Sequence, residues 1–199
     1  MKEKKSYELL VLAENNSGYV SLMEAKAMGI APAYLSEGVQ EGRFQKVARG
    51  LYLRKGYSND PYFVIQFTYR KAVFSGASAL YLHGLIDEEP KIMEVTLPQN
   101  YMTKGIKGLR CSHANPEKYL LGLGIAATKE GHLVSCYDKE RAFLEAIHNP
   151  GSLDVLAIAG RFFSEDHSEE SLLGYAEALG LSDRLAFLET LLNNKNGTC

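Results

Sequence analysis

The sequence changes character at Gly42, and this change restricts the fold more than any other feature. Before it, Ser21 and Glu24 have the Ser-x-x-Glu spacing of a capping box, in which each side chain bonds the other residue's backbone N–H. This spacing predicts a short helix that ends at Gly29. Pro32 favours the first turn of a second helix, which we expect to run to Glu41. Two short helices separated by a turn of about three or four residues are typical of a helix-turn-helix.

After Gly42 the residues favour extended structure. The runs 44–47 and 51–53 are rich in β-favouring residues, and Ala48-Arg49-Gly50 between them supplies a turn with glycine where a positive φ is needed. A further helix is predicted over 6–14, after a possible Ser6 N-cap. Three helices followed by a hairpin predict a winged helix-turn-helix DNA-binding domain over residues 1–56.

Charge is distributed unevenly along the chain. The predicted hairpin, "GRFQKVARGLYLRKG", carries five basic residues and no acidic one. Residues 1–57 contain nine Lys and Arg against six Asp and Glu, whereas residues 138–199 contain five against eleven. The net charge of -2 excludes a globally basic nucleic-acid coat protein. The asymmetry predicts different roles for the two ends, and chance variation among solvated faces is the alternative.

In a winged helix-turn-helix the second helix of the motif enters the major groove of DNA. At 100° per residue Leu35 and Val39 fall on one stripe, which we expect to face the core. The outward positions are then Ala33, Glu37 and Gln40, with Tyr34 and Ser36 at the flanks.

These outward side chains suit contacts with bases and phosphates. Gln40 can pair bidentately with adenine, Ala33 can meet a thymine methyl group, and Tyr34 can bond a phosphate or stack. Glu37 and Glu41 oppose binding to a polyanion, unless Glu37 accepts from a cytosine amino group or Glu41 points sideways.

Basic side chains of the hairpin and its neighbours are expected to hold the phosphates, and Arg49 at the tip suits a narrow minor groove. With Arg54, Lys55 and the lysines at positions 2, 4 and 5, about four to six phosphate contacts are predicted. Each contact adds about -0.9 to the slope of log K for DNA binding against log salt concentration. Modest affinity from one copy favours a homodimer on an inverted repeat. A winged unit that binds only protein is the alternative. The predicted DNA-binding residues are Lys26, Ala33, Tyr34, Ser36, Gln40, Arg43, Lys46 and Arg49.

A second domain is predicted over residues 62–199, after a joint at 57–61. The patterns predict strands over 71–74, 92–97, 124–128 and 132–137. They predict helices over 62–69, 75–83, 138–148, 153–163, 169–179 and 183–193. The fold class is therefore α/β in the α+β sense: a winged helix-turn-helix, then a mixed α+β domain with a helical C-terminal part.

Three segments resemble chemical sites only superficially. The run from His83 to Glu89 gathers a histidine and three acids, but Gly84 ends the helix between them, which favours a capped helix and a solvated loop. Cys111-Ser112-His113 lacks a second pair at zinc spacing. The segment 122–127 has glycines like a dinucleotide fingerprint, without the flanking strand and helix. We expect no catalytic residue, no metal site and no cofactor, and therefore no enzyme.

The cysteines bear on the compartment. Cys111, Cys136 and Cys199 are scattered and lack CxxC spacing, which predicts a reducing environment. Residues 72–86 form the longest uncharged run, which is too short to span a bilayer, and no signal peptide is recognised. A cytoplasmic protein that does not bind membranes is expected.

Four motifs together suggest a family. They are "RGLYL" (49–53), "FSGASALYLHGLIDEEP" (74–90), "VTLPQNY" (95–101) and "YDKERAFLEAI" (137–147). In this order, over about residues 5–150, the chain resembles the AbiEi antitoxins of bacterial abortive-infection systems. Where relatives commonly have Thr-Leu after Glu-Arg, this chain has Ala142-Phe143. The substituted residues remain apolar enough for the same amphipathic helix, in which Asp138 suits the N-cap.

The resemblance implies a type IV toxin–antitoxin pair. The N-terminal domain would bind inverted repeats of double-stranded DNA in its own promoter and repress transcription. The rest would counter a toxin resembling nucleotidyltransferases, usually without a stable complex. Segments 75–84 and 138–148 are the candidates for the framework of the neutralising domain.

Two other classes stay open at the level of sequence. One is a DNA-binding module joined to a catalytic domain, with His83 and Asp87 at a metal. The other is a stand-alone transcriptional regulator whose C-terminal part senses a small molecule.

Overall fold

The computed structural model describes residues 2–101 and 108–196, so that Cys199 lies outside the described part. Its contacts divide the chain into two compact units, Met1–Arg70 and Lys71–Cys199. The predicted joint at 57–61 therefore lies inside the first unit. Helix α4 (Pro61–Thr68), which the sequence patterns assigned to the second domain, belongs to the first.

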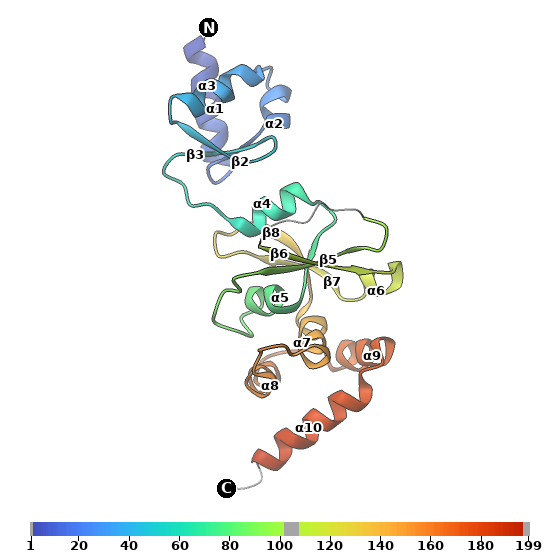
Figure 1. Ribbon diagram of the computed structural model, residues 1–199. Coiled ribbons are helices and arrows are strands. Elements are labelled where there is room, and N and C mark those ends of the chain that lie inside the picture. The colour runs from blue at the N-terminus through green and yellow to red at the C-terminus, as the bar shows by residue number, and fades with distance from the viewer. Residues whose placement is uncertain (1, 102–107, 197–199) are drawn as a thin grey trace. The chain divides into compact units, whose positions relative to one another are not determined.

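The first unit is a winged helix-turn-helix (Figure 1). Its elements are α1 (Lys2–Asn15), β1 (Tyr19–Ser21), α2 (Leu22–Ala27), α3 (Pro32–Gln40), β2 (Phe44–Ala48), β3 (Leu51–Arg54) and α4. The strands form an antiparallel sheet in the order β1-β3-β2. The capping box is present, because the Ser21 hydroxyl accepts from Glu24 N at 3.1 Å and Glu24 Oε2 accepts from Ser21 N at 3.0 Å.

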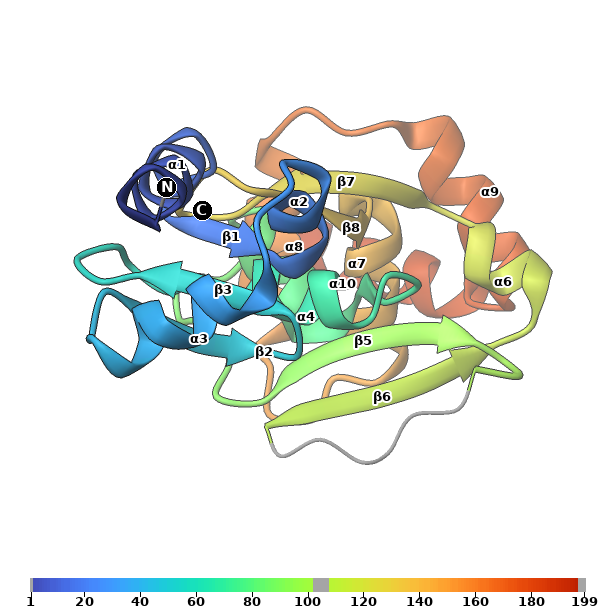
Figure 2. The same cartoon turned by 90° about the horizontal axis from the view of Figure 1, so that it is seen from above.

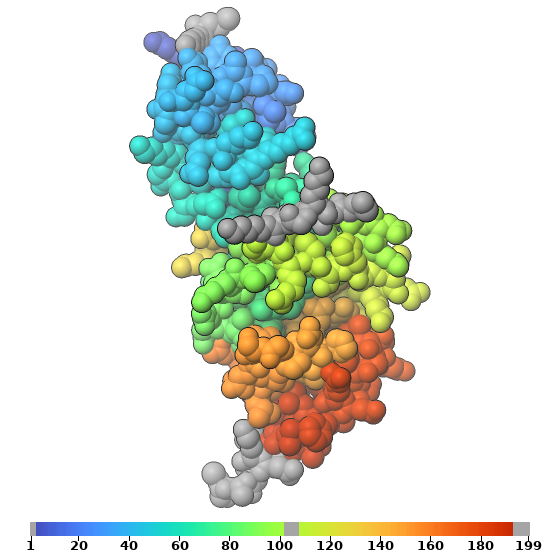
Figure 3. All heavy atoms as spheres, in the orientation of Figure 1, coloured from blue at the N-terminus to red at the C-terminus, as the bar shows by residue number. Residues whose placement is uncertain are grey.

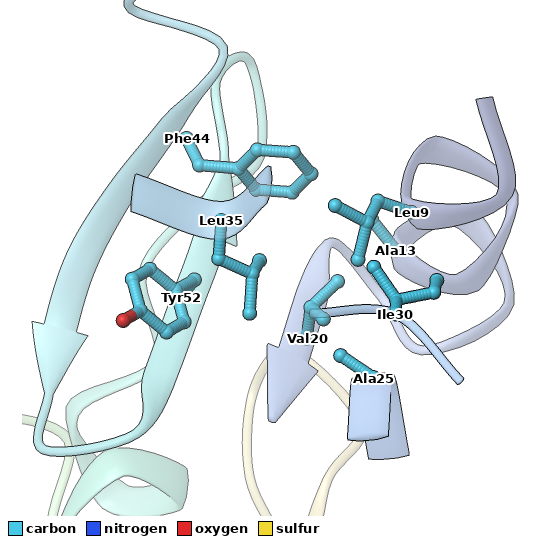
Figure 4. Packing of buried hydrophobic residues seen from close by; sticks show 8 residues of the cluster. All are labelled: Leu9, Ala13, Val20, Ala25, Ile30, Leu35, Phe44 and Tyr52. Carbon is cyan, nitrogen blue, oxygen red and sulfur yellow. The ribbon is translucent and has the colours of Figure 1, made fainter. Parts of the chain in front are cut away.

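The core of this unit lies on both faces of the thin sheet. On one face, side chains from α1, α2, α3 and all three strands meet (Figure 4). That cluster consists of Leu9, Ala13, Val20, Ala25, Ile30, Leu35, Phe44 and Tyr52. On the other face Tyr19, Leu51 and Leu53 pack with aromatic residues of α4. Alternation along β1 and β3 sends successive side chains to opposite clusters, which is why these two strands are buried on both sides.

Helix α4 belongs to the first unit because its start is fixed to β1. Asp60 is fully buried and caps α4 by accepting from Phe63 N at 3.1 Å, and its own N–H donates to the Tyr19 hydroxyl at 2.7 Å. The rings of Tyr19 and Phe63 lie 4.6 Å apart. The turn-rich residues 57–61, predicted to join two domains, form a loop within the first unit.

The second unit contains a five-stranded mixed sheet in the order β6-β5-β4-β8-β7. Its strands are β4 (Val73–Phe74), β5 (Met93–Pro98), β6 (Leu109–Ala114), β7 (Leu123–Ala127) and β8 (Leu133–Tyr137). The β4–β8 and β5–β6 pairs are parallel, and β4–β5 and β7–β8 are antiparallel. Figure 2 shows β5 and β6 side by side at one edge.

The helices of this unit are α5 (Gly76–Leu82), α6 (Pro116–Leu120), α7 (Lys139–His148), α8 (Val155–Ser164), α9 (Glu169–Leu179) and α10 (Ser182–Asn196). Helices α5 and α7 lie on the same side of the sheet (Figure 1). The helical C-terminal part, orange to red, forms one packed body with α7 (Figure 3). Asp154 caps α8 in place of the expected Ser152. No helix in the described ranges combines the length and the apolar character needed to span a membrane.

Candidate nucleic-acid interface

Helix α3 has an inward and an outward stripe. Leu35 is fully buried as expected, but the prediction that Val39 faces the core is wrong, because its side chain is 36% exposed. Gly38 is buried instead and lies against Phe44. A Cβ at Gly38 would stand 2.8 Å from Phe44 Cδ2. The inward stripe therefore follows i, i+3 spacing, and glycine lets the hairpin approach the helix closely.

The outward stripe brings three of the predicted residues together. Ala33 and Gln40, predicted outward, and Ser36, predicted at a flank, are all exposed. Their i, i+3 and i+7 spacing puts them on one face of the helix. Glu37, also predicted outward, is half-buried. Tyr34, predicted at a flank, is half-buried and packs against the core cluster.

The hairpin stands beside α3. Strands β2 and β3 pair with a register shift between Lys46 and Ala48, and Gly50 in the turn has φ of 78°. Phe44 and Lys46 share one face of β2, because side chains alternate along a strand. Since Phe44 packs on α3, the exposed Lys46 lies on the α3 side of the sheet. The turn is tied to α2 by a 2.7 Å hydrogen bond from Leu22 N to Gly50 O.

The basic residues divide into free and paired groups. Lys26, Lys46, Arg49 and Lys55 are exposed and form no ion pair within residues 2–101 and 108–196. Arg43, in contrast, donates from Nε to Glu41 Oε2 at 2.7 Å and also bonds the Ser6 hydroxyl. Arg54 pairs with Glu14 at 2.8 Å.

The Arg43–Glu41 pair bears on the acidic residues of α3. The sequence placed Glu41 next to DNA as an unfavourable charge, and the structure places a guanidinium against that carboxylate. Balancing Glu41 lowers the repulsion that a phosphate would meet at this end of α3. A direct phosphate contact by Arg43 stays a prediction.

The chemistry suggested for His83 and Asp87 is not assembled in the second unit. His83 Nε2 lies 2.7 Å from Tyr137 O. Asp87 instead forms a bidentate ion pair with Arg161, with N–O distances of 2.8 and 2.9 Å. The Arg161 guanidinium holds the pKa of the Asp87 carboxyl below its usual value. Among the residues described, no group of three or more metal-ligating side chains converges.

The Tyr-Asp-x-Glu-Arg segment at the start of α7 is buried. Asp138 caps α7 by accepting from Arg141 N at 2.9 Å, and it also accepts from the Tyr175 hydroxyl of α9 at 2.9 Å. Glu140 accepts from Ser168 N at 2.7 Å and so anchors the start of α9. Arg141 lies over the Tyr137 ring, with 4.7 Å from Cζ to the ring centre, and donates to Glu145 at 3.0 Å.

This segment is therefore a framework that joins α7, α9 and β8. Burial raises the pKa of Tyr137 to about 12, against the opposing effect of the neighbouring Arg141. The phenol stays neutral at physiological pH and serves as a ring on which the guanidinium stacks.

Comparisons with known proteins bear on the winged helix-turn-helix and on the overall fold. Residues 7–55 match the family model described as "Transcriptional regulator, AbiEi antitoxin". No curated protein was found to match the chain. Among solved structures the chain is similar to the RV2827C protein from Mycobacterium tuberculosis, with 15% identity and a TM-score of 0.63, over 92% of this chain and 73% of that one. At this identity the similarity shows a shared fold.

Proposed function

We propose, from the match of residues 7–55 to the AbiEi antitoxin family of transcriptional regulators, that the protein binds inverted repeats in its own promoter and represses transcription. The observation that carries the proposal is the outward stripe of α3, Ala33, Ser36 and Gln40, which stands beside a hairpin whose Lys46 and Arg49 are exposed and form no ion pair among the described residues. Base-reading and phosphate-holding groups lie in one compact unit.

In the proposed complex α3 enters the major groove. Gln40 offers both a donor and an acceptor, which suits adenine, and Ala33 suits a thymine methyl group. Lys46 and Arg49 hold the adjacent phosphates, with Arg49 at the hairpin tip able to enter the minor groove. Tyr34, held half-buried against the core, acts at the edge of this surface.

A single copy presents few unpaired cations toward DNA. With Lys26, Lys46, Arg49 and Lys55 as the candidates, about four phosphates are engaged per copy, and each adds about -0.9 to the slope of log K against log salt. Two copies on an inverted repeat would double the contacts, and we propose a homodimer on the operator.

We further propose that the second unit counters a nucleotidyltransferase-like toxin in the cytoplasm. The support is the family of the N-terminal unit together with the "YDKERAFLEAI" and "FSGASALYLHGLIDEEP" motifs, which form the interlocked α7 and α5 framework. Co-expression of this chain should restore growth to cells that express a nucleotidyltransferase-like toxin of a type IV toxin–antitoxin system. Unrelieved toxicity with the antitoxin present at full level would reject this part.

The test of DNA binding is a fluorescence-anisotropy titration against the chain's own upstream DNA and a scrambled duplex, across a salt series. Preferential binding to the upstream DNA is expected, with a slope that reports several phosphates. Gln40→Ala should lose that preference, whereas Arg49→Ala should weaken binding to both duplexes alike.

Two outcomes would contradict the proposal. Failure to bind either duplex at low salt would make the basic hairpin an ordinary surface. If Gln40→Ala and Arg49→Ala lowered the affinity for the upstream duplex and for the scrambled duplex by the same factor, α3 would not be the element that reads bases.

A further inference from the structure

The second unit contains a cleft of about 680 Å³ that the DNA-binding function does not use. Its floor comes from β5 and β6, and its walls come from α7, the loop 149–153 and the start of α5. This volume is in the range of sites that enclose a small molecule. Leu153 and Leu181 add apolar surface to one wall.

The charged side chains of the cleft form an ordered arrangement. Its two carboxylates are fully engaged: Glu94 accepts from Ala77 N at 2.9 Å and pairs with Arg110, and Glu145 accepts from Gly76 N at 2.9 Å and pairs with Arg141. The first backbone N–H groups of α5 are thereby occupied by the protein's own carboxylates. They are not the groups that would bind a ligand.

Donors remain on the basic side chains. Arg141 is only 6% exposed, and its Nη1 is buried without a hydrogen-bond partner in the described structure. A buried guanidinium nitrogen left unsatisfied is costly, so its retention points to a group that it can bond. Lys118, on α6, is exposed at the same cleft and pairs with no carboxylate of the described residues.

We propose that this cleft binds a small molecule that carries a phosphate group, with Arg141, Arg110 and Lys118 as its anion-binding residues. Three cationic side chains against two engaged carboxylates leave a net positive site. Arginine is suited to phosphate because its planar donors match two oxygens at once. Ser112 adds a hydroxyl on the floor, and the apolar wall accommodates the body of the ligand.

The framework around Arg141 explains how the site is held rigid. The guanidinium is fixed from below by the Tyr137 ring and from the side by Glu145, while Asp138 and Glu140 bind α9 to the same turn of α7. A donor held in place before binding loses little entropy when the ligand arrives. The proposal is independent of whether the first unit binds DNA.

The test uses the full chain and phenyl phosphate, in an NMR titration at constant ionic strength without phosphate buffer. Benzoate and benzyl alcohol serve as the matched carboxylate and neutral probes. Saturable shifts are expected at residues of the cleft, and phenyl phosphate should bind at least about tenfold more tightly than benzoate, since it brings an additional charge-assisted contact.

Substitutions at the cleft test which side chains bind the phosphate group of the probe. Lys118→Gln and Arg110→Gln should each raise the Kd about tenfold, as expected for loss of one charge-assisted hydrogen bond, while Lys129→Gln on the β7–β8 turn should leave it unchanged. Arg141→Lys keeps the charge but loses the second donor, and it should also weaken binding, with the folded spectrum retained.

Three results would overturn the proposal. These are no saturable shift at millimolar phenyl phosphate, equal binding of benzyl alcohol, or an equal effect of Lys129→Gln and Lys118→Gln. The last would mean that the protein attracts anions through its general charge.

Discussion

Arg49 in the first unit and Arg141 in the second place the same side chain in two contrasting environments. Arg49 stands at a hairpin tip, exposed and without an ion pair within the described residues. Arg141 is buried between a tyrosine ring and a carboxylate, at the centre of a framework that joins α7 to α9. The contrast teaches that burial and partners decide how much a basic residue contributes to the stability of the fold, and its position in a charged run does not reveal them.

The largest expected difference in stability comes from replacing each of these two arginines with alanine. Arg141→Ala should lower the free energy of unfolding of the second unit by about 3 kcal/mol, because it removes one partner of a largely buried pair. Arg49→Ala should change stability by less than about 0.5 kcal/mol, as exposed substitutions do. Urea unfolding followed by circular dichroism measures both. Equal effects would mean that Arg141 is no more structural than Arg49.

Next in size is a pair of glycine substitutions. Gly38→Ala should destabilise the first unit by about 1–2 kcal/mol and weaken DNA binding, because its Cβ meets the Phe44 ring on which the hairpin rests. Gly174→Ala in α9 has open space and should stabilise the second unit by up to about 1 kcal/mol, as alanine favours helices. Thermal unfolding distinguishes the signs. A stabilised Gly38→Ala would show that the hairpin is free to move away.

The free and paired cations of the wing can be compared in the same way. Lys46→Gln should weaken binding to both upstream and scrambled DNA several-fold and lower the salt slope by about 0.9. Arg43→Gln should also weaken binding, because it uncovers the charge of Glu41 and removes the predicted phosphate contact of Arg43. The double variant Glu41→Gln/Arg43→Gln should therefore recover only part of the loss. Anisotropy titrations measure both effects, and a double variant that binds as the wild type does would exclude the phosphate contact of Arg43.

The smallest effect concerns the exposed Asp87–Arg161 pair. Because Arg161 lowers the pKa of Asp87 below 3.8, the pair contributes stability above that pH and loses it as the pH falls through the lower folded-state value. An NMR titration of the Asp87 carboxyl should show its pKa rising toward 3.8 in Arg161→Gln. An unchanged pKa would mean that the two side chains do not stay paired in solution.

The sequence was sufficient for the features that depend on local chemistry. The capping box at Ser21 and Glu24 and the Asp138 cap each follow from a side chain that bonds a nearby backbone N–H, and both are present. The turn at Gly50 follows from the positive φ that glycine adopts readily, and it is present too. The winged helix-turn-helix followed from the order of three predicted helices and a hairpin within residues 1–56. Its likeness to a known family adds an independent match over residues 7–55.

Features that depend on distant partners were missed. Gly38 has no side chain to signal burial, so Val39 was assigned to the core in its place. Strand β6 has mostly exposed or half-buried polar residues and pairs with β5 at the edge of the sheet, so no alternation marks it. Asn115-Pro116 was a recognisable start for α6 and was overlooked. The cleft around Arg141 arises from segments spread over more than a hundred residues, and no short motif encodes it.

The two stripes of α3 have a consequence for evolution. Leu35 and Gly38 hold the helix against the hairpin, whereas Ala33, Ser36 and Gln40 do not contribute to the buried core. With α3 in its proposed role of reading the operator, mutations on the outer stripe would alter which operator is recognised while the fold keeps its stability. A duplicated copy of this gene would then separate from its parent through changes on this stripe.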